Sequence, residues 1–256
     1  MDQVPVAFVS HGAPLSLEDP DWMESLGRWG ERLGVIRSIL VISAHWVSQT
    51  LKMGPLQPVP LVYDFWGFPQ RFYQMTYGAP LASDLGRRLA SLTGMGEILS
   101  VPDRGLDHGM WVPLRGMFPD ARLPVLGLSL PSLSPMVLYR LGKLLAPLRQ
   151  EGVLILASGG MTHNLSELNS DPLSGPFSWA VEFERWVVAA LFKKDLEALL
   201  AFESRAPHAR RSHPTIEHLA PLFVALGSAE GSTRVSFPVT GFRWGGLSLR
   251  SVQWDV

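Results

Sequence analysis

Three histidines occupy the same position relative to three apolar runs of the chain, because each lies just beyond the carboxyl end of its run. They are His11, His45 and His163. If the runs are parallel strands of one sheet, their carboxyl ends meet at the edge where open α/β proteins bind ligands. Neutral imidazole is a common ligand of zinc and of non-haem iron. The spacing therefore predicts a metal site at that edge.

Three more residues are candidates for the same chemistry. His108 lies three residues before Trp111, whose ring could form one wall of an aromatic site. Glu217 and His218 are adjacent in a segment expected to be helical, where neighbouring residues diverge by about 100°. Either Glu217 or His218 could therefore face a site from that segment.

A segment rich in proline and aromatic residues covers 49–77 and has no clean periodicity. Within a compact domain, a loop of this length is usually functional. The aromatic residues of its cluster 65–69 lack helical spacing, and loop aromatics of this kind often line ligand sites. A flat aromatic ligand is one that such a loop could hold.

Composition and absent motifs exclude several function classes. The 22 basic and 23 acidic side chains give a net charge of −1, which argues against a surface that tracks nucleic acid phosphates. The absence of cysteine excludes disulfides, thiolate metal sites and cysteine nucleophiles. No HExxH, Walker or G-x-S-x-G motif occurs. Without an apolar run of about 18 residues or a signal-peptide pattern, we expect a cytoplasmic protein with no membrane partner.

The elements that must hold these residues alternate along the chain. Nearly continuous apolar runs, typical of strands covered on both faces, occupy 6–9, 38–43, 124–129 and 152–157. Helical periodicity marks 21–33, 81–92, 136–148, 179–202 and 214–226. Two late segments, 233–239 and 247–254, are expected to be further strands. The alternation predicts one α/β domain over residues 1–256, with a mostly parallel central sheet flanked by helices.

Six short motifs follow one another along the chain: SHGAP (10–14), SAHW (43–46), YDFWGFP (63–69), LDHGMW (106–111), ASGGMTHNL (157–165) and PTIEH (214–218). Together they resemble the 4,5-DOPA dioxygenase extradiol family, which belongs to the class III extradiol ring-cleavage dioxygenases. No single motif is decisive, but six in this order are specific. The resemblance implies a phosphorylase/hydrolase-like α/β fold and a single catalytic domain.

The resemblance also implies a reaction and a site. The reaction is the oxidative opening of a DOPA-like catechol ring by O2, next to the two ring hydroxyls and not between them. One Fe(II) or Zn(II) per chain would be held by His11, His45 and His218. The catalytic residues would be His163, as acid and base beside the metal, and His108, near the substrate.

Aromatic side chains are the expected contacts of the catechol ring, and we assign this role to Trp46, Phe65 and Trp111. Exposed aromatic side chains are also compatible with a homodimer. A carboxylate on the substrate would need a cation as partner. The candidates for that cation are three arginines, Arg71, Arg104 and Arg243.

Two other interpretations stay open. The same scaffold could carry a zinc-dependent hydrolase that uses a metal-activated water. It could also be a non-catalytic relative that keeps the cavity to bind a metal or a ligand. Because zinc has no redox chemistry, iron dependence and oxygen consumption separate the dioxygenase from both.

Overall fold

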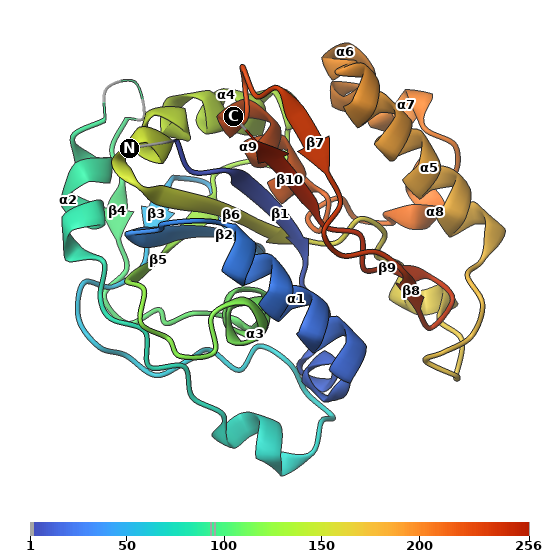
Figure 1. Cartoon of the computed structure of the whole chain (residues 1–256), viewed down its shortest axis with the longest axis horizontal. Coiled ribbons are helices and arrows are strands. Elements are labelled where there is room, and N and C mark those ends of the chain that lie inside the picture. Colours follow the sequence, from blue (N-terminus) through green and yellow to red (C-terminus); the bar gives the residue numbers. More distant parts are fainter. Residues whose placement is uncertain (1–2, 93, 95, 256) are drawn as a thin grey trace.

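The apolar runs expected to be strands form the middle of an eight-stranded sheet (Figure 1). The computed structural model describes residues 3–92, 94 and 96–255. The strand order is β4-β3-β5-β2-β6-β1-β10-β7. The four central strands are parallel to one another: β5 (Val125–Leu130), β2 (Ser38–Val47), β6 (Val153–Gly159) and β1 (Val6–Ser10). The mostly parallel sheet expected from the sequence is therefore confirmed.

Short strands complete both sides of this sheet. Two antiparallel strands follow β1, namely β10 (Val252–Asp255) and then β7 (Arg234–Ser236). Beyond β5 lie β3 (Lys52–Met53), which is antiparallel to β5, and β4 (Leu99–Ser100). A separate two-stranded sheet is formed by β8 (Phe242–Arg243) and β9 (Leu247–Ser248). The late segment 247–254 thus contributes to two sheets instead of forming one strand.

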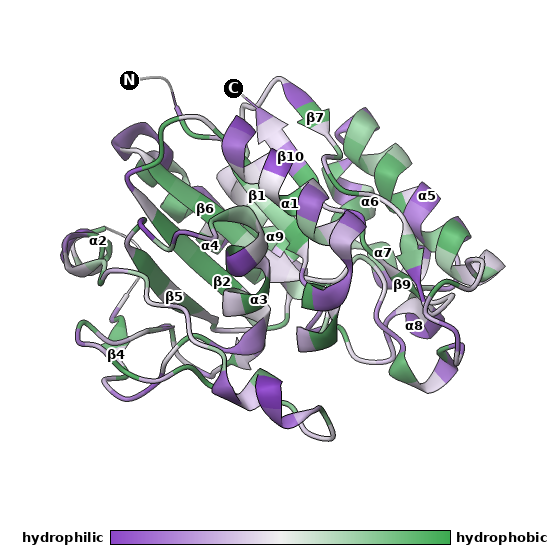
Figure 2. Cartoon of the chain, turned by 60° about the horizontal axis from the view of Figure 1, so that its bottom comes forward, coloured by the Kyte–Doolittle hydropathy of each residue, from purple (hydrophilic) through white to green (hydrophobic). Residues whose placement is uncertain are grey.

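Helices cover both faces of the main sheet (Figures 1 and 2). One face packs against α1 (Pro20–Arg32) and α3 (His108–Met117), and the other against α4 (Pro135–Leu145) and α9 (Ala220–Ser228). Alternate residues of β1 enter the two cores, which explains why its apolar run is continuous. Figure 2 shows the central strands in the hydrophobic colour along most of their length.

The helical stretch expected over 179–202 is broken into three helices. They are α5 (Ser178–Lys193), α6 (Leu196–Leu200) and α7 (Phe202–Arg205). The break comes at Lys194, whose φ of 53° is left-handed and ends α5. Asp195 then begins α6, because its side chain accepts a hydrogen bond from the Ala198 N–H at 3.0 Å.

The helix expected over 214–226 begins later than the sequence indicates. Helix α9 starts at Ala220, and residues 214–219 form turns. Pro221 explains the difference, because a proline inside a helix removes one hydrogen bond and its ring collides with the carbonyl four residues earlier. At the start of α9 the same proline is tolerated. His218 consequently lies just before the helix and not one turn inside it.

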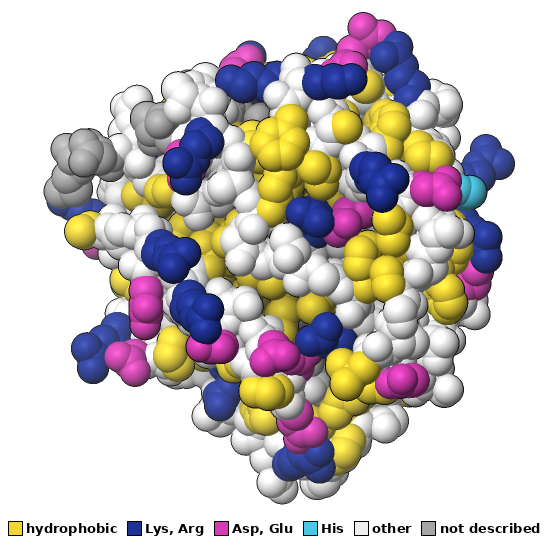
Figure 3. Space-filling model, turned by 45° about the vertical axis from the view of Figure 1, so that its right-hand side comes forward, with side chains coloured by type: hydrophobic (Ala, Val, Ile, Leu, Met, Phe, Trp, Pro, Cys, Tyr) yellow, Lys and Arg dark blue, Asp and Glu magenta, His cyan; other side chains and the backbone are white. Residues whose placement is uncertain are grey.

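The remaining short helices connect the layers. They are α2 (Ser83–Ala90), α8 (Ala209–Ser212) and the 3-10 segments Pro14–Glu18, Gln70–Gln74, Ala146–Glu151 and Leu165–Glu167. Much of the segment 49–77 is irregular, as expected, and it packs aromatic side chains against the core beneath α3. Within the described residues, no helix combines the length and the apolar character needed to cross a membrane. Figure 3 shows basic and acidic side chains interspersed on one face, in keeping with the net charge of −1.

Candidate metal centre and active site

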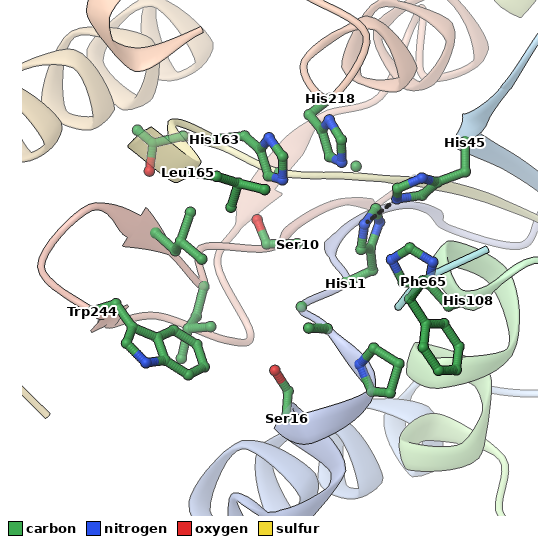
Figure 4. Close-up of a pocket in the computed structure, with 18 of the residues that line it drawn as sticks. Ser10, His11, Ser16, His45, Phe65, His108, His163, Leu165, His218 and Trp244 are labelled. Carbon is green, nitrogen blue, oxygen red and sulfur yellow. Dashed lines mark hydrogen bonds between the residues drawn. The ribbon is translucent and has the colours of Figure 1, made fainter. Parts of the chain in front are cut away.

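Five histidines surround one cavity of about 430 Å³ (Figure 4). The ring centroids of His11, His45 and His218 are separated by 4.9 to 5.5 Å. The ring of His108 lies 4.0 Å from that of His45, and His163 stacks on His218 at 3.4 Å. The structure therefore brings together all five histidines that the sequence assigned to metal binding or catalysis.

The sheet topology explains this convergence. Strands β2, β6 and β1 are adjacent and parallel, so their carboxyl ends meet at one edge. His11 and His163 follow β1 and β6, and His45 lies near the end of β2. His218 reaches the same edge from the turn before α9. A Cβ at Gly159 would lie 2.1 Å from the His218 carbonyl oxygen, so glycine is required for β6 to approach this turn.

The hydrogen bonds of His11 fix which ring nitrogen faces the cavity. Its Nδ1 lies 3.0 Å from the Ser158 hydroxyl oxygen, and that hydroxyl donates its own proton to the Gly109 carbonyl. Ser158 can therefore only accept from His11, which places the His11 proton on Nδ1. The lone pair of His11 Nε2 is left to point into the cavity.

His45 and His218 are oriented in the same way by carboxylates. Nδ1 of His45 lies 3.4 Å from an Asp64 carboxylate oxygen, and Nδ1 of His218 donates to Glu217 at 3.1 Å. Carboxylates accept hydrogen bonds, so the His218 proton sits on Nδ1 and its Nε2 carries a lone pair, and a proton on Nδ1 of His45 would face Asp64 in the same way. Nε2 of His45 lies only 3.1 Å from Nε2 of His11 (Figure 4). At this distance one Nε2 can donate a hydrogen bond to the lone pair of the other, and a metal ion held by both Nε2 atoms would take the place of that proton.

Burial keeps these imidazoles neutral. Burial and neighbouring imidazoles lower the pKa of His45 to about 2 and that of His163 to about 3. The pKa of His11 falls well below 6.5 for the same reasons. Burial also lowers the pKa of His218, although its contact with Glu217 opposes the change. Neutral imidazole is the form that binds metals, so the site is in its ligand state at pH 7.

The residues present fit a metal ion, and two groups could share in holding it. Potential ligand atoms of His11, His45 and His108 lie within 4.8 Å of one another, and so do those of His163, Glu217 and His218. One feature distinguishes His218 from His108. Nε2 of His218 is buried without a hydrogen-bond partner among the described residues, as expected for an atom that coordinates a metal.

Comparison with known proteins assigns the family. Residues 6–247 match the family described as the catalytic LigB subunit of aromatic ring-opening dioxygenase. The chain belongs to this family. The family implies an aromatic substrate, O2 and a metal cofactor, and the histidines around the cavity are suitable ligands for that metal.

Relatives that match nearly the whole chain carry a consistent name. The 4,5-DOPA dioxygenase extradiol of Beta vulgaris is 37% identical, with 96% of this chain and 95% of the relative covered. The protein of the same name from Escherichia coli K12 is 35% identical, with coverages of 98% and 94%. A crystal structure of an uncharacterized protein from Escherichia coli K12 matches with a TM-score of 0.83, 31% identity and coverages of 99% and 100%. This LigB-family chain is an extradiol ring-cleavage dioxygenase, which confirms the resemblance and reaction class expected from its motifs.

The three aromatic residues expected to contact substrate are placed differently. Phe65 lines the cavity of this dioxygenase, with its ring 5.8 Å from His108. Trp46 lies outside it, beneath the guanidinium of Arg104 at 4.8 Å. Trp111 is fully buried in the core, and its Nε1 donates to the backbone at 3.4 Å. The structure therefore places Phe65 beside the histidines, whereas the side chains of Trp46 and Trp111 do not line the cavity.

Asp64 contacts two of the cavity histidines, and the sequence alone did not single it out. One carboxylate oxygen accepts hydrogen bonds from the His108 backbone N–H at 3.0 Å and from His108 Nδ1 at 2.8 Å. The other oxygen faces Nδ1 of His45. Burial raises the pKa of Asp64, but the hydrogen bonds from His108 outweigh it and lower the pKa to about 2. An acidic residue inside the loop motif YDFWGFP was the available signal.

A buried acid, Asp107, supports the carboxyl end of strand β2. Asp107 is fully buried and accepts a hydrogen bond from the Ser43 hydroxyl at 2.7 Å. Ser43 Oγ also accepts from the His45 N–H at 3.1 Å, so Asp107 acts on the position of His45 through Ser43. Burial raises the pKa of Asp107 to about 6, although the Ser43 hydrogen bond opposes this change.

Proposed function

We propose that this extradiol dioxygenase holds one Fe(II) per chain through His11, His45 and His218 and opens a catechol ring with O2. The observation that carries the ligand assignment is shared by the three residues. Each has its Nδ1 next to an acceptor, Ser158, Asp64 or Glu217, and Nε2 of His218, unlike that of His108, is buried without a partner among the described residues. Each is thereby left with an Nε2 lone pair for the metal.

Iron is favoured over zinc by the chemistry of the family. When bound, Fe(II) would supply the redox chemistry that a reaction of catechol with O2 requires, whereas zinc supplies none. We propose that His163 acts as the acid and base. It is neutral at pH 7, lines the cavity and is held by its backbone N–H, which donates to the Ser212 carbonyl at 2.9 Å. A neutral imidazole can take the proton of a catechol hydroxyl and later return a proton to the product.

We propose that His108 hydrogen-bonds a substrate oxygen. Because its Nδ1 donates to Asp64, its Nε2 carries a lone pair and accepts from a hydroxyl. The rings of Phe65 and His108 meet edge to face, with an interplanar angle of 87°. A catechol in the cavity would therefore contact Phe65 on one side and the histidines on the other. We propose residues 1–256 as one catalytic domain, while the homodimer and the cytoplasmic location remain predictions.

Metal-dependent turnover tests the proposal. The purified chain is stripped of metal, loaded anaerobically with Fe(II) or Zn(II), and mixed with 4-propylcatechol in an oxygen electrode. We expect oxygen consumption and a yellow ring-opened product with iron only, at one O2 per product. A fully iron-loaded protein that consumes no oxygen with any catechol, or equal activity with zinc, would contradict it.

A further inference from the structure

Trp244 has a backbone conformation that is uncommon for an aromatic residue. Its φ of 50° lies in the left-handed region, where the Cβ of an L-residue comes too close to the following carbonyl oxygen. Among the described residues, three other non-glycine residues share this conformation, and none of them lines the cavity: Ala121, Lys194 and His208. Strained backbone of this kind persists only where the surrounding structure holds it, and it clusters at ligand sites. Trp244 is therefore the strained residue that belongs to the cavity.

Backbone hydrogen bonds hold Trp244 in its left-handed conformation. It lies in the turn between β8 and β9, where its N–H donates to the Pro172 carbonyl at 2.9 Å and its carbonyl accepts from the Asn169 N–H at 2.9 Å. The carbonyl of the next residue, Gly245, accepts from the Phe177 N–H at 2.8 Å. A Cβ at Gly245 would lie 2.8 Å from the Phe177 ring, so the turn packs closely against this neighbouring segment. These contacts fix the point from which the Trp244 side chain leaves the turn.

The rest of the β8–β9 hairpin is anchored to the site and to the N-terminal part of the chain. The Thr162 hydroxyl donates to the Gly246 carbonyl at 2.8 Å and accepts from the Ser248 N–H at 2.8 Å. Thr162 directly precedes the proposed acid and base. Arg243, one of the arginines considered as partners of a substrate carboxylate, pairs with Asp19 at 2.6 Å. The turn is therefore held on several sides relative to the histidines.

The indole of Trp244 lines the cavity on the side away from His45 and His108 (Figure 4). The residue is half-buried, so part of its surface is open to contact with a ligand. A cavity of about 430 Å³ lies in the range of sites that hold ligands larger than one ring. A catechol bound at the histidines therefore leaves space toward Trp244 for a group carried by its ring.

The chemistry of indole suits such a group. It offers a large, rigid apolar surface, and its ring face also attracts an ammonium group. We propose that Trp244 is a specificity-determining residue that binds the ring substituent of the catechol. The left-handed backbone serves this contact, because it presents a bulky aromatic side chain from a position where local geometry favours glycine or asparagine. This inference rests on the proposed ring-opening function.

The substitution Trp244→Asn separates the contact from the backbone. It removes the indole, and asparagine tolerates a left-handed φ. With the Fe(II)-loaded enzyme, 4-propylcatechol is compared with unsubstituted catechol, which lacks the group that Trp244 would bind. We expect the propylcatechol-to-catechol ratio of kcat/KM to fall by about tenfold, as the loss of contact with a methylene or two allows. We also expect a midpoint of thermal unfolding no lower than that of the wild type, since the strain is relieved.

An unchanged ratio in Trp244→Asn would overturn the inference. If the thermal stability falls as well, Trp244 is a structural residue of the hairpin. Trp244→Phe is the conservative variant, which keeps an aromatic ring, and its ratio should stay within about threefold of the wild type.

Lys194→Asn is the matched control for the release of strain. Lys194 has a φ of 53°, is exposed and does not line the cavity. We expect the wild-type ratio of kcat/KM in this variant. A ratio that falls in Lys194→Asn as it does in Trp244→Asn would show that the indole contact is not the cause, and would contradict the inference.

A binding measurement separates this inference from the proposed reaction. The Zn(II)-loaded wild type and Trp244→Asn are titrated calorimetrically with 4-propylcatechol and with catechol. We expect the substitution to weaken binding of 4-propylcatechol relative to catechol by about tenfold. If the iron-loaded wild type turns over neither compound while this loss of binding occurs, the proposed reaction fails and the role of Trp244 stands. If turnover occurs and the substitution leaves both ratios unchanged, the role of Trp244 fails alone.

Discussion

Asp64 offers a direct way to test how the metal ligands are held. The substitution Asp64→Asn keeps the size of the side chain but replaces one carboxylate oxygen by an NH2 group. One oxygen can still accept from His108, at the position where it now receives bonds of 2.8 and 3.0 Å. The NH2 group would then face Nδ1 of His45, which the wild-type carboxylate approaches at 3.4 Å.

Two donors facing each other force a change in His45. To accept from the new NH2 group, His45 must move its proton to Nε2, and that removes the lone pair proposed to bind the metal. Loss of a partner that orients a metal ligand typically costs 10- to 100-fold in metal affinity, or about 1.4 to 2.7 kcal/mol. We therefore expect the Kd for the metal to rise within that range in Asp64→Asn.

The assay is a competition titration with Zn(II) and a chromophoric chelator, which reports affinity without turnover. Asp120→Asn is the matched control, because Asp120 is an exposed carboxylate that lies 3.5 Å from Arg122 and does not line the cavity. We expect wild-type affinity for this control. Wild-type affinity in Asp64→Asn as well would show that Asp64 does not set the tautomer of His45.

Three further predictions concern the site and its supports. His218→Ala should lose metal, whereas His163→Ala should keep its metal content and lose turnover. Metal analysis and oxygen uptake distinguish these two outcomes. Metal loss in His163→Ala would make His163 a ligand. Asp107, whose pKa is raised from 3.8 to about 6, binds a proton more tightly when folded. Protonated Asp107 therefore makes its full contribution to the free energy of unfolding below about pH 4. This contribution, up to about 3 kcal/mol, is lost as pH rises through 6. Asp107→Asn should flatten this part of the stability profile in urea unfolding between pH 4 and 7, and a profile parallel to wild type would contradict the assignment. Gly159→Ala should lower stability by about 1–3 kcal/mol and weaken metal binding, since its Cβ would collide with the His218 carbonyl. Gly175→Ala, with open space around its Cβ, is the control, and equal thermal stability of the two variants would contradict the close approach.

The sequence predicted the sheet well because its central strands are buried on both faces. Burial on both sides requires apolar residues at nearly every position, as in β6, where each residue from Val153 to Gly159 is buried. The carboxyl-edge positions of His11, His45 and His163 followed from those strands. Helix ends were less predictable, because the left-handed Lys194 and the position of Pro221 decide them locally.

The supporting residues of the site could not be predicted from the sequence. Asp64 lies on an irregular segment, so no periodicity relates it to His45 or to His108. Ser158 belongs to β6, but its contact with His11 depends on the parallel register that places it opposite Val9. Trp46 is next to His45 in the chain, yet its side chain packs away from the cavity under Arg104. Adjacency to His45 in the chain therefore did not place the Trp46 side chain in the cavity.

The assignment on which the proposed reaction depends is that His11, His45 and His218 hold the metal through their Nε2 atoms. The decisive experiment is a crystal structure of the anaerobically Fe(II)-loaded protein, with anomalous scattering recorded on both sides of the iron absorption edge. We expect one anomalous peak per chain, bonded to the three Nε2 atoms, with Ser158, Asp64 and Glu217 still at the three Nδ1 atoms. A peak bonded to His108 in place of His218, or to an Nδ1 atom, would contradict this assignment.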